Sequence, residues 1–261
     1  MDKLILLGND IASLWSSSSA QYLKGAGDTI LLAVIATLFG CLIGFICGIL
    51  QTIPVTQRDG KIKKFFVYLI RAIIRIYVEV FRGTPMILQA VFVFFALPYF
   101  SGNAIRLDVM TASYLVVSIN TGAYMAETVR GGILSIEKGQ TEGAKAIGMT
   151  HVQTMIHVIL PQTLLNILPQ IGNNLIINIK DTSVMFIIGF TELFAVHKGI
   201  VGGNYKYFPS AVITMAIYLF MTVICSILLR FMEKKLQGPS NFNIASNDTL
   251  SQTSGMYHYT E

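Results

Sequence analysis

The stretch EGAKAIGMTHVQTMIHVILP, Glu142–Pro161, decides how this chain is organised. It is long enough for about five helical turns, its first half is charged and polar, and long apolar runs flank it. Small residues stand at Gly143, Ala144 and Gly148, with Ala144 and Gly148 four positions apart, so one helical face lets the backbone of a partner approach closely. Glu142 stands near the helix start, where a negative charge interacts favourably with the helix dipole. The stretch predicts a docking helix exposed to water between two membrane segments.

The composition is that of a polytopic membrane protein. Of 261 residues, 53% are hydrophobic and 13% charged, and the mean hydropathy is +0.62, whereas soluble domains carry about 25% charged residues. The net charge of +5 does not indicate nucleic-acid binding, because the basic residues alternate with apolar runs instead of forming one patch. Anionic lipid headgroups and the orientation bias of membrane proteins account for them. The histidines and cysteines lack the spacing of a metal or disulfide site.

Five segments are predicted to span the membrane, since a helix needs roughly 20 mostly apolar residues to cross it. They are 29–50, 84–99 (slightly short), 109–129, 151–179 (studded with amides) and 209–229. Ahead of the second span, charged residues recur every three or four positions at Arg71, Arg75, Glu79 and Arg82. Charges on one helical face predict an amphipathic elbow over 61–81 at the cytoplasmic interface.

The chain divides into three parts. Residues 1–27 are predicted to be an extracytoplasmic segment, 28–236 the transmembrane domain with its docking helix at about 137–149, and 237–261 a polar, disordered cytoplasmic tail. With five spans, most of the 19 Lys and Arg residues fall on the same side as Glu142. The positive-inside rule makes that side cytoplasmic, with the N-terminus outside and the C-terminus inside.

Glu142–Pro161 resembles the EAA loop of the membrane subunits of ABC importers, which reads EAA, three residues, G, nine residues, I-x-L-P. Gly143 replaces the usual Ala and Val158 the usual Ile. From roughly residue 27 to residue 235 the chain also resembles the polar amino-acid importer permeases, the group of the histidine, arginine and glutamine systems. The matching segments are VEVFRGTPMILQ (78–89), NTGAYMAETVRGGI (120–133), EKGQTEGAKAIG (137–148), LPQIGNNLI (168–176) and KDTSVMFIIGFTEL (180–193).

The resemblance implies an all-α integral membrane protein of the cell membrane, with five transmembrane helices in the type I ABC importer permease (MetI-like) architecture. It implies a permease subunit that moves a polar amino acid, driven by ATP hydrolysis in partner subunits. Glu142, Gly143, Ala144 and Gly148 are then the residues that couple to the ATPase. The expected partners are cytosolic ABC ATPase subunits, an extracytoplasmic solute-binding protein and a second permease, either identical or different.

No P-loop pattern G-x-x-x-x-G-K-[ST] occurs in the sequence, so this chain is expected to hold no ATP itself. We expect a transport subunit and no enzyme, with no cofactor or metal of its own, while the partner ATPase binds ATP and Mg²⁺. The amino acid that is carried stays open. A secondary transporter is the alternative, but it would need intramembrane carboxylates or histidines for an ion relay, and the mid-span polar residues are mostly amides and hydroxyls. A membrane enzyme would need a catalytic cluster, and neither it nor a scaffold would need the coupling loop.

The Arg82–Pro85 segment interrupts a helix, because glycine and proline break helices. Backbone groups freed at membrane depth are tolerated where they line a cavity. The resemblance therefore places Thr84, Pro85 and Gln89 near the substrate path. Arg82 is predicted to pair with Glu79.

The third span carries polar residues at its centre. An amide, a phenol and a glycine that leaves room for a zwitterion fit an amino-acid site, so Asn120, Gly122 and Tyr124 are predicted to bind substrate. The alternative for Asn120 is a hydrogen bond to a neighbouring helix. Glu127 is predicted to form a salt bridge with Arg130.

The fourth span has a polar stripe at Thr163, Asn166, Gln170 and Asn173, spaced three, four and three residues apart. The stripe predicts either a wall of the substrate path or a subunit interface held by amides. Basic amino-acid permeases are expected to have carboxylates in this pocket, and Thr163 and Tyr124 occupy positions where such acids could be, which argues against a lysine or arginine substrate.

Two further patterns have structural interpretations. Gly40, Gly44 and Gly48 form a small-xxx-small ladder, which predicts close helix packing in the first span. Lys180 is predicted to complement the C-terminus of the fourth span, and Asp181 to open the next turn as an N-cap.

Overall fold

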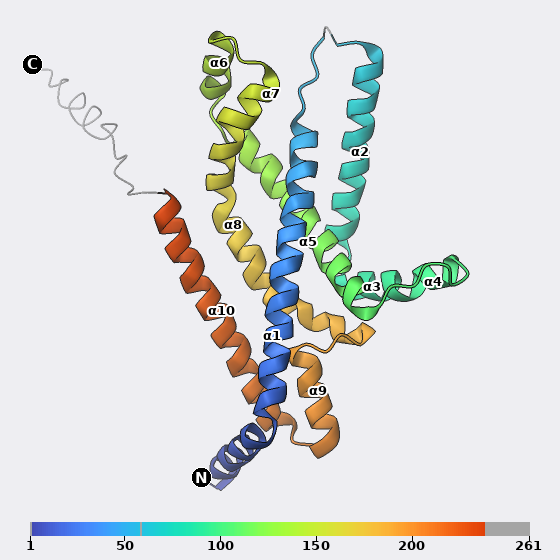
Figure 1. The fold of residues 1–261 in the computed structure, drawn as a ribbon, viewed down its shortest axis with the longest axis vertical. Coiled ribbons are helices and arrows are strands. Elements are labelled where there is room, and N and C mark those ends of the chain that lie inside the picture. Colours follow the sequence, from blue (N-terminus) through green and yellow to red (C-terminus); the bar gives the residue numbers. More distant parts are fainter. Residues whose placement is uncertain (1, 58, 238–261) are drawn as a thin grey trace, which may run out of the picture.

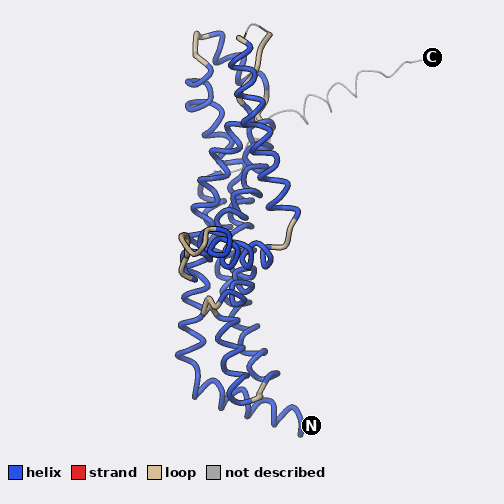
Figure 2. Tube along the Cα trace, turned by 90° about the vertical axis from the view of Figure 1, so that its right-hand side faces the viewer, coloured by secondary structure: helices blue, strands red, loops and turns tan. Residues whose placement is uncertain are grey.

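The computed structural model describes residues 2–57 and 59–237, and within these ranges every regular element is helical. Figure 1 shows an elongated bundle with α1 (Asp2–Thr52) and α5 (Val109–Leu134) crossing its centre. Figure 2 shows the same long shape from the side, with the N-terminus at one end. The all-helical class is confirmed. The predicted tail lies outside the described residues from position 238 onward.

Helix α1 contains 51 residues, which corresponds to about 75 Å, far more than the roughly 30 Å of a bilayer core. It continues unbroken through residue 27, where the sequence predicts a boundary between an outer segment and the membrane domain. Figure 1 shows its first turns running at an angle to the rest. One long helix therefore carries both parts.

The packing of α1 on α5 depends on a row of glycines, as their spacing predicts. The residues that face α5 are Gly40, Gly44 and Gly48. A Cβ atom at Gly44 would lie 2.3 Å from Cβ of Met125 and 2.8 Å from its carbonyl carbon, so only a glycine allows this distance. The predicted role in helix packing is confirmed.

Helix α2 (Lys61–Gly83) packs along α1 and α5, and the chain then turns by 110°. After the turn come α3 (Met86–Val91), a π-helical segment (Phe92–Ala96) and α4 (Leu97–Phe100). The turn arises because Thr84 and Pro85 are extended and Pro85 has no N–H with which to continue the helix. The sequence separates an elbow from a second span, whereas the structure joins both into one bent unit whose longer arm is α2.

The second half of the chain forms another bent unit followed by a straight helix. Its elements are α6 (Lys138–Ala146), α7 (His151–Thr154), a π-helical segment (Met155–Ile159), α8 (Leu160–Asp181), a 3-10 helix (Thr182–Ile188), α9 (Leu193–Asn204) and α10 (Tyr207–Gln237). The π-helical turns end just before Pro161, which has no N–H for the carbonyl four residues back. The 151–188 helix meets α9 at 52°.

The junction after α8 differs from the sequence prediction. Lys180 stands in the last turn of α8 as predicted, but the Asp181 side chain makes no capping hydrogen bond. The prediction of an N-cap is wrong because Asp181 has helical dihedrals and the chain runs directly into the 3-10 helix, so no new set of free N–H groups arises there. The capping carboxylate in this region is Glu192, which accepts from the N–H groups of Phe194 (2.8 Å) and Ala195 (2.7 Å) at the start of α9.

The described residues contain two helices, α1 and α10, that are long and apolar enough to cross a membrane, or up to four crossing units if each bent pair counts as one. The third predicted span lies in α5, which is not among them, and its polar residues include Asn120 and Tyr124. A multi-pass membrane protein agrees with these helices and with the many exposed apolar side chains on α2 and α10. The count of five spans stays a prediction.

Candidate functional site

A cavity of about 480 Å³ lies at the break between α2 and α3. Four residues predicted to bind substrate line it together: Thr84, Pro85, Asn120 and Tyr124. The remaining lining residues are Arg82, Gly83, Met86, Thr121, Asn174, Ile177, Asn178 and Asp181. The helix break, the middle of α5 and the last turns of α8 thus converge on one polar space.

Gln89 lies behind the cavity wall and fixes its shape. Its Nε2 donates to the carbonyl oxygens of Phe81 and Thr84, both at 2.9 Å, and contacts the Thr84 hydroxyl at 3.0 Å. The Gln89 carbonyl in turn accepts from Nδ2 of Asn120 at 3.0 Å, and Asn120 also donates to the Phe81 carbonyl at 3.1 Å. Buried carbonyls freed by the helix break need such partners. Gln89 therefore holds the bend and orients Asn120.

The inner face of α8 supplies cavity residues that sequence reasoning did not assign to substrate. Asn178 donates to the hydroxyls of Thr37 (2.8 Å) and Thr121 (3.0 Å), joining α8 to α1 and α5. Asn174 lies one turn earlier, and Asp181 about one turn later. Their spacing of four and three residues was the available signal, since it puts all three on one helical face, next to the face that carries the predicted stripe.

An ion-pair network closes one side of the cavity. Arg82 Nη1 donates a hydrogen bond to Glu127 Oε2 in an ion pair, and Arg130 Nη2 lies 3.6 Å from Glu127 Oε1. The Arg82 guanidinium also stands 5.3 Å from the centre of the Tyr124 ring, within the range of a cation–π contact. The predicted Glu127–Arg130 pair is confirmed. The predicted pairing of Arg82 with Glu79 is wrong, because packing of α2 on α5 offers Arg82 a carboxylate on the other helix.

Several predicted substrate residues lie elsewhere. Gly122 faces α1 and α2, where a Cβ would lie 2.7 Å from the Tyr77 hydroxyl and 2.8 Å from Ile43; it makes room for helices. Thr163 is fully buried, and among the described residues its hydroxyl has no hydrogen-bond partner. The three other residues of the predicted stripe are exposed and do not line the cavity: Asn166, Gln170 and Asn173.

The predicted coupling residues lie at one end of the bundle. Figure 1 shows α6 and α7 there, at the same end of the bundle as the loop that joins α1 to α2. Glu142 and Gly143 are exposed on α6, while Ala144 is buried. Gly148 has φ +85°, and its N–H donates to the Lys145 carbonyl at 3.0 Å, so α6 ends in a left-handed glycine turn. This end presents a short helix that is closed at its C-terminus by the glycine turn.

The neighbouring loop is tied by Asp59. Its carboxylate accepts from Lys63 Nζ at 2.7 Å and from the Thr56 N–H at 2.8 Å. The hydrogen bond from Lys63, followed by those from Thr56, lowers the pKa of Asp59 to about 2. The carboxylate is ionised at neutral pH, so these contacts hold the described residues on either side of the loop together.

Residues 65–238 match the family described as binding-protein-dependent transport system inner membrane component. The chain belongs to this family. Its members are permeases of ABC importers, so this protein is a membrane subunit that works with an ATPase and a binding protein, and it is not itself the ATPase.

Two relatives are similar over most of the permease. The glutamine transport system permease protein GlnP of Escherichia coli strain K12 is 34% identical over 228 residues, which cover 87% of this chain and 98% of GlnP. The probable amino-acid permease protein YxeN of Bacillus subtilis strain 168 is 30% identical over 213 residues, covering 81% and 89%.

Solved structures are similar as well. A chain from the crystal structure of an amino acid ABC transporter with histidines has a TM-score of 0.73 and 32% identity, with 84% of this chain and 96% of that chain covered. An inward-facing structure of the MetNI methionine ABC transporter has a TM-score of 0.68 at 19% identity, covering 84% and 98%, and shows a shared fold.

Proposed function

We propose that this permease carries a polar amino acid across the cytoplasmic membrane and binds it in the cavity between α2, α5 and α8. The convergence of Thr84, Asn120 and Tyr124 with the carboxylate of Asp181 in that cavity carries the proposal. A volume of about 480 Å³ is in the usual range for small-molecule sites. The names of the relatives, which include glutamine and amino-acid permeases, support the same substrate class.

The cavity chemistry suits a zwitterion. Asp181 provides a negative charge for an α-ammonium group, and the hydroxyl of Tyr124 provides a donor for a carboxylate. The NH2 groups of Asn120 and Asn174 already donate within the protein, so these amides present their oxygens as acceptors for the ammonium group. Asn120 is held by Gln89, so its position is fixed before substrate arrives, which reduces the entropy lost on binding.

We propose that α6 is the lever that links transport to ATP. Glu142, Gly143 and the exposed Ile147 (79% exposed) give the end of the bundle a small, partly apolar surface that a groove on an ATPase can cover. ATP and Mg²⁺ bind to that partner, and its movements shift α6 as a rigid body. The substrate path then opens alternately to the two sides.

In the membrane, we propose five spans with the N-terminus outside and the C-terminus in the cytoplasm. The basic residues around Lys61–Lys64 and on α6 lie at the end that α6 occupies, which supports a cytoplasmic position for it. A second permease, identical or different, completes the pathway, and a solute-binding protein delivers the amino acid at the opposite end.

The test is reconstitution of the complete transporter, with its ATPase and binding protein, in liposomes and measurement of radiolabelled glutamine and histidine uptake. Asp181→Asn keeps the shape and removes the charge. Loss of one hydrogen bond to a charged group is worth about 1.5–3 kcal/mol, so uptake at low substrate should fall about 10- to 150-fold. Thr128→Ala, on α5 outside the cavity, is the matched control. ATP-independent uptake driven by an ion gradient would refute the proposal and favour a secondary transporter.

A further inference from the structure

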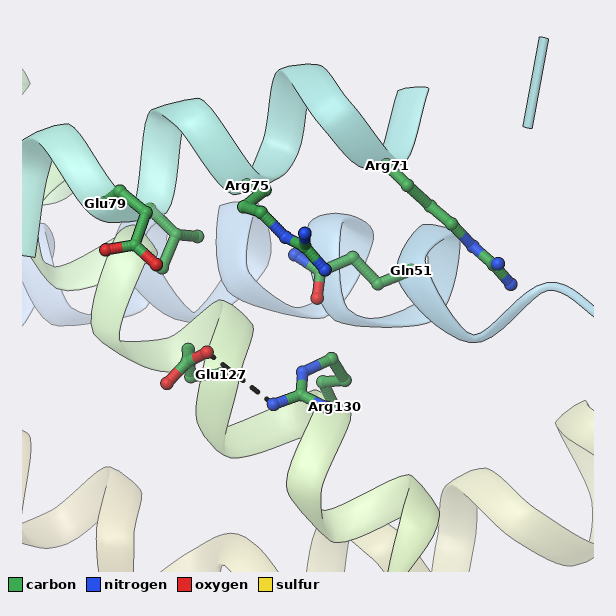
Figure 3. Close-up of a pocket in the computed structure, with 7 residues that line it drawn as sticks. Gln51, Arg71, Arg75, Glu79, Glu127 and Arg130 are labelled. Atoms are coloured by element: carbon green, nitrogen blue, oxygen red, sulfur yellow. Dashed lines mark ion pairs between the residues drawn. The ribbon is translucent and has the colours of Figure 1, made fainter. Parts of the chain in front are cut away.

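A second cavity, of about 360 Å³, lies between α2, α5 and the end of α1. Figure 3 shows that its side chains come from all three helices, with Gln51, Arg75 and Arg130 pointing into the space between them. The charged residues that line it are Arg71, Arg75, Glu79, Glu127 and Arg130, with Gln51 beside them. Three guanidinium groups and two carboxylates give the lining a net charge of +1.

Part of this charge has no partner within the described residues. The four ion pairs of the described chain include neither Arg75 nor Glu79. Arg71 donates through Nη2 to the Ile53 carbonyl at 2.5 Å, but its Nε is buried without a hydrogen-bond partner there. Buried or semi-buried polar groups normally have partners, so the cavity offers both donors and acceptors to a ligand.

This charged cavity adjoins the substrate cavity. Arg82 lines the substrate cavity and Glu127 lines the charged one, and the two side chains form an ion pair. This pair separates the two cavities. Each side chain of that pair is about 40% exposed (39% and 41%). An exposed ion pair is easily exchanged for water or another charge. The Arg82–Glu127 pair can therefore separate, and connect the two cavities, while the helices stay folded.

The distribution of charge identifies the ligand class. Arg75 and Arg130 can hold a carboxylate through paired N–H donors, while Glu79 can hold an ammonium group. An inorganic phosphate or a lipid phosphate would use the arginines but would be repelled by Glu79 and Glu127. A molecule that carries both charges uses the whole lining.

We propose that the charged cavity is a second binding station for the α-amino acid, which the substrate enters after it passes the Arg82–Glu127 pair. The proposal rests on the function proposed above. Substrate passes from neutral amides and Asp181 to the charges of Arg75 and Glu79, which form no ion pair within the described residues and lie nearer the α6 end, where the ATPase docks. The path through this permease then contains two sites in series.

The experiment is equilibrium binding of radiolabelled L-glutamine and L-histidine to the purified complex of permease and ATPase, without binding protein. Wild type should bind about two amino acids per permease chain at saturation. Arg75→Gln should bind about one, with the remaining site lost only when Asp181→Asn is added. Arg75→Lys should restore part of the second site, since it keeps the charge. Lys61→Gln, on the same helix outside the cavity, should bind like wild type.

Other outcomes separate the two proposals. One amino acid per chain in wild type, unchanged by Arg75→Gln and lost in Asp181→Asn, would overturn the second station and leave the proposed function standing. No binding in any variant, with no uptake, would overturn the proposed function itself. If Arg75→Gln releases co-purified phosphatidylglycerol and leaves amino-acid binding unchanged, the cavity belongs to a lipid headgroup and the inference is wrong. Glu79→Gln gives an independent check, because it should weaken amino-acid binding but not lipid binding.

Discussion

Replacing Gly44 with alanine tests the contact that positions both cavities. A Cβ at this position would lie 2.3 Å from Cβ of Met125 and 3.0 Å from the backbone nitrogen of Ala126. Carbon atoms pack best at about 3.5–4.0 Å, so α1 and α5 would have to separate by roughly 1 Å. Neither atom belongs to the flexible end of a side chain, and rotamer changes therefore cannot relieve the clash.

The cost follows from this geometry. Overpacking of a close interface typically lowers the free energy of unfolding by about 1–3 kcal/mol, and a clash with backbone atoms belongs at the upper end of this range. The matched control is Gly27→Ala in the same helix, where nothing lies within 4 Å of the added Cβ. Both variants gain similar helix propensity, about 1 kcal/mol relative to glycine, so the difference between them isolates the clash.

The assay is the thermal unfolding midpoint of the purified complex, measured as the temperature at which the monodisperse peak in size-exclusion chromatography is half lost. A difference of about 2–3 kcal/mol corresponds to roughly 4–12 °C for a chain of this length, with Gly44→Ala the less stable. Equal midpoints for the two variants would show that α1 and α5 do not pack as closely as described, and the reasoning would fail.

Further predictions concern the site and the coupling end. Gln89→Leu removes the hydrogen-bond donor to the Thr84 carbonyl and the acceptor of Asn120 Nδ2, while the Phe81 carbonyl keeps Asn120. At about 1–3 kcal/mol per unsatisfied group, uptake should fall at least tenfold, measured with radiolabelled substrate. Gly148→Ala forces a side chain into φ +85° at about 1–2 kcal/mol and should uncouple binding-protein-stimulated ATP hydrolysis from uptake, whereas Gly143→Ala, with open space around it, should not. Glu127→Gln breaks both of its ion pairs and should raise ATP-independent efflux of substrate from preloaded liposomes. The loss of stability should be small because the pairs are exposed. Unchanged efflux would argue against a barrier formed by the Arg82–Glu127 pair. Because the pKa of Asp59 is lowered to about 2, its loop contacts should persist above the ordinary pKa of about 4 and be lost only as pH falls through about 2, measured by hydrogen exchange of the 53–60 loop; loss of protection already near pH 4 would contradict this.

The cavity shows how far sequence reasoning reaches. The helix break at Arg82–Pro85 and the polar centre of the third span are visible in the chain, because glycine, proline and mid-span amides are unusual in apolar runs. The resemblance to the importer permeases pointed to Thr84 and Pro85 at the break and, with the polar centre of the span, to Asn120 and Tyr124; these four residues lie together. Gly122 lies within two residues of Asn120 yet faces α1 and α2, since the rotation of α5 about its axis depends on how closely α1 approaches.

Local sequence also favours local partners. Glu79 is three residues from Arg82 and was the natural choice for an ion pair, but the structure brings Glu127 of α5 to Arg82 instead. Asp181 was read as a cap because it follows a long apolar helix. It lines the cavity, because α8 continues into a 3-10 helix and keeps the side chain on the inner face.

The sequence by itself determined the helical class, a polar helix near Glu142, the helix break and the glycine row on α1, whereas the left-handed turn at Gly148 came from the structure. Each of these sequence features depends on composition, spacing or backbone preference within a few residues. Only the tertiary structure decided which face of α5 and α8 meets the cavity, which carboxylate Arg82 binds, and that two cavities adjoin through that pair. These depend on the rotation and closeness of helices far apart in the chain, and helix packing is set by many weak contacts that no short segment contains.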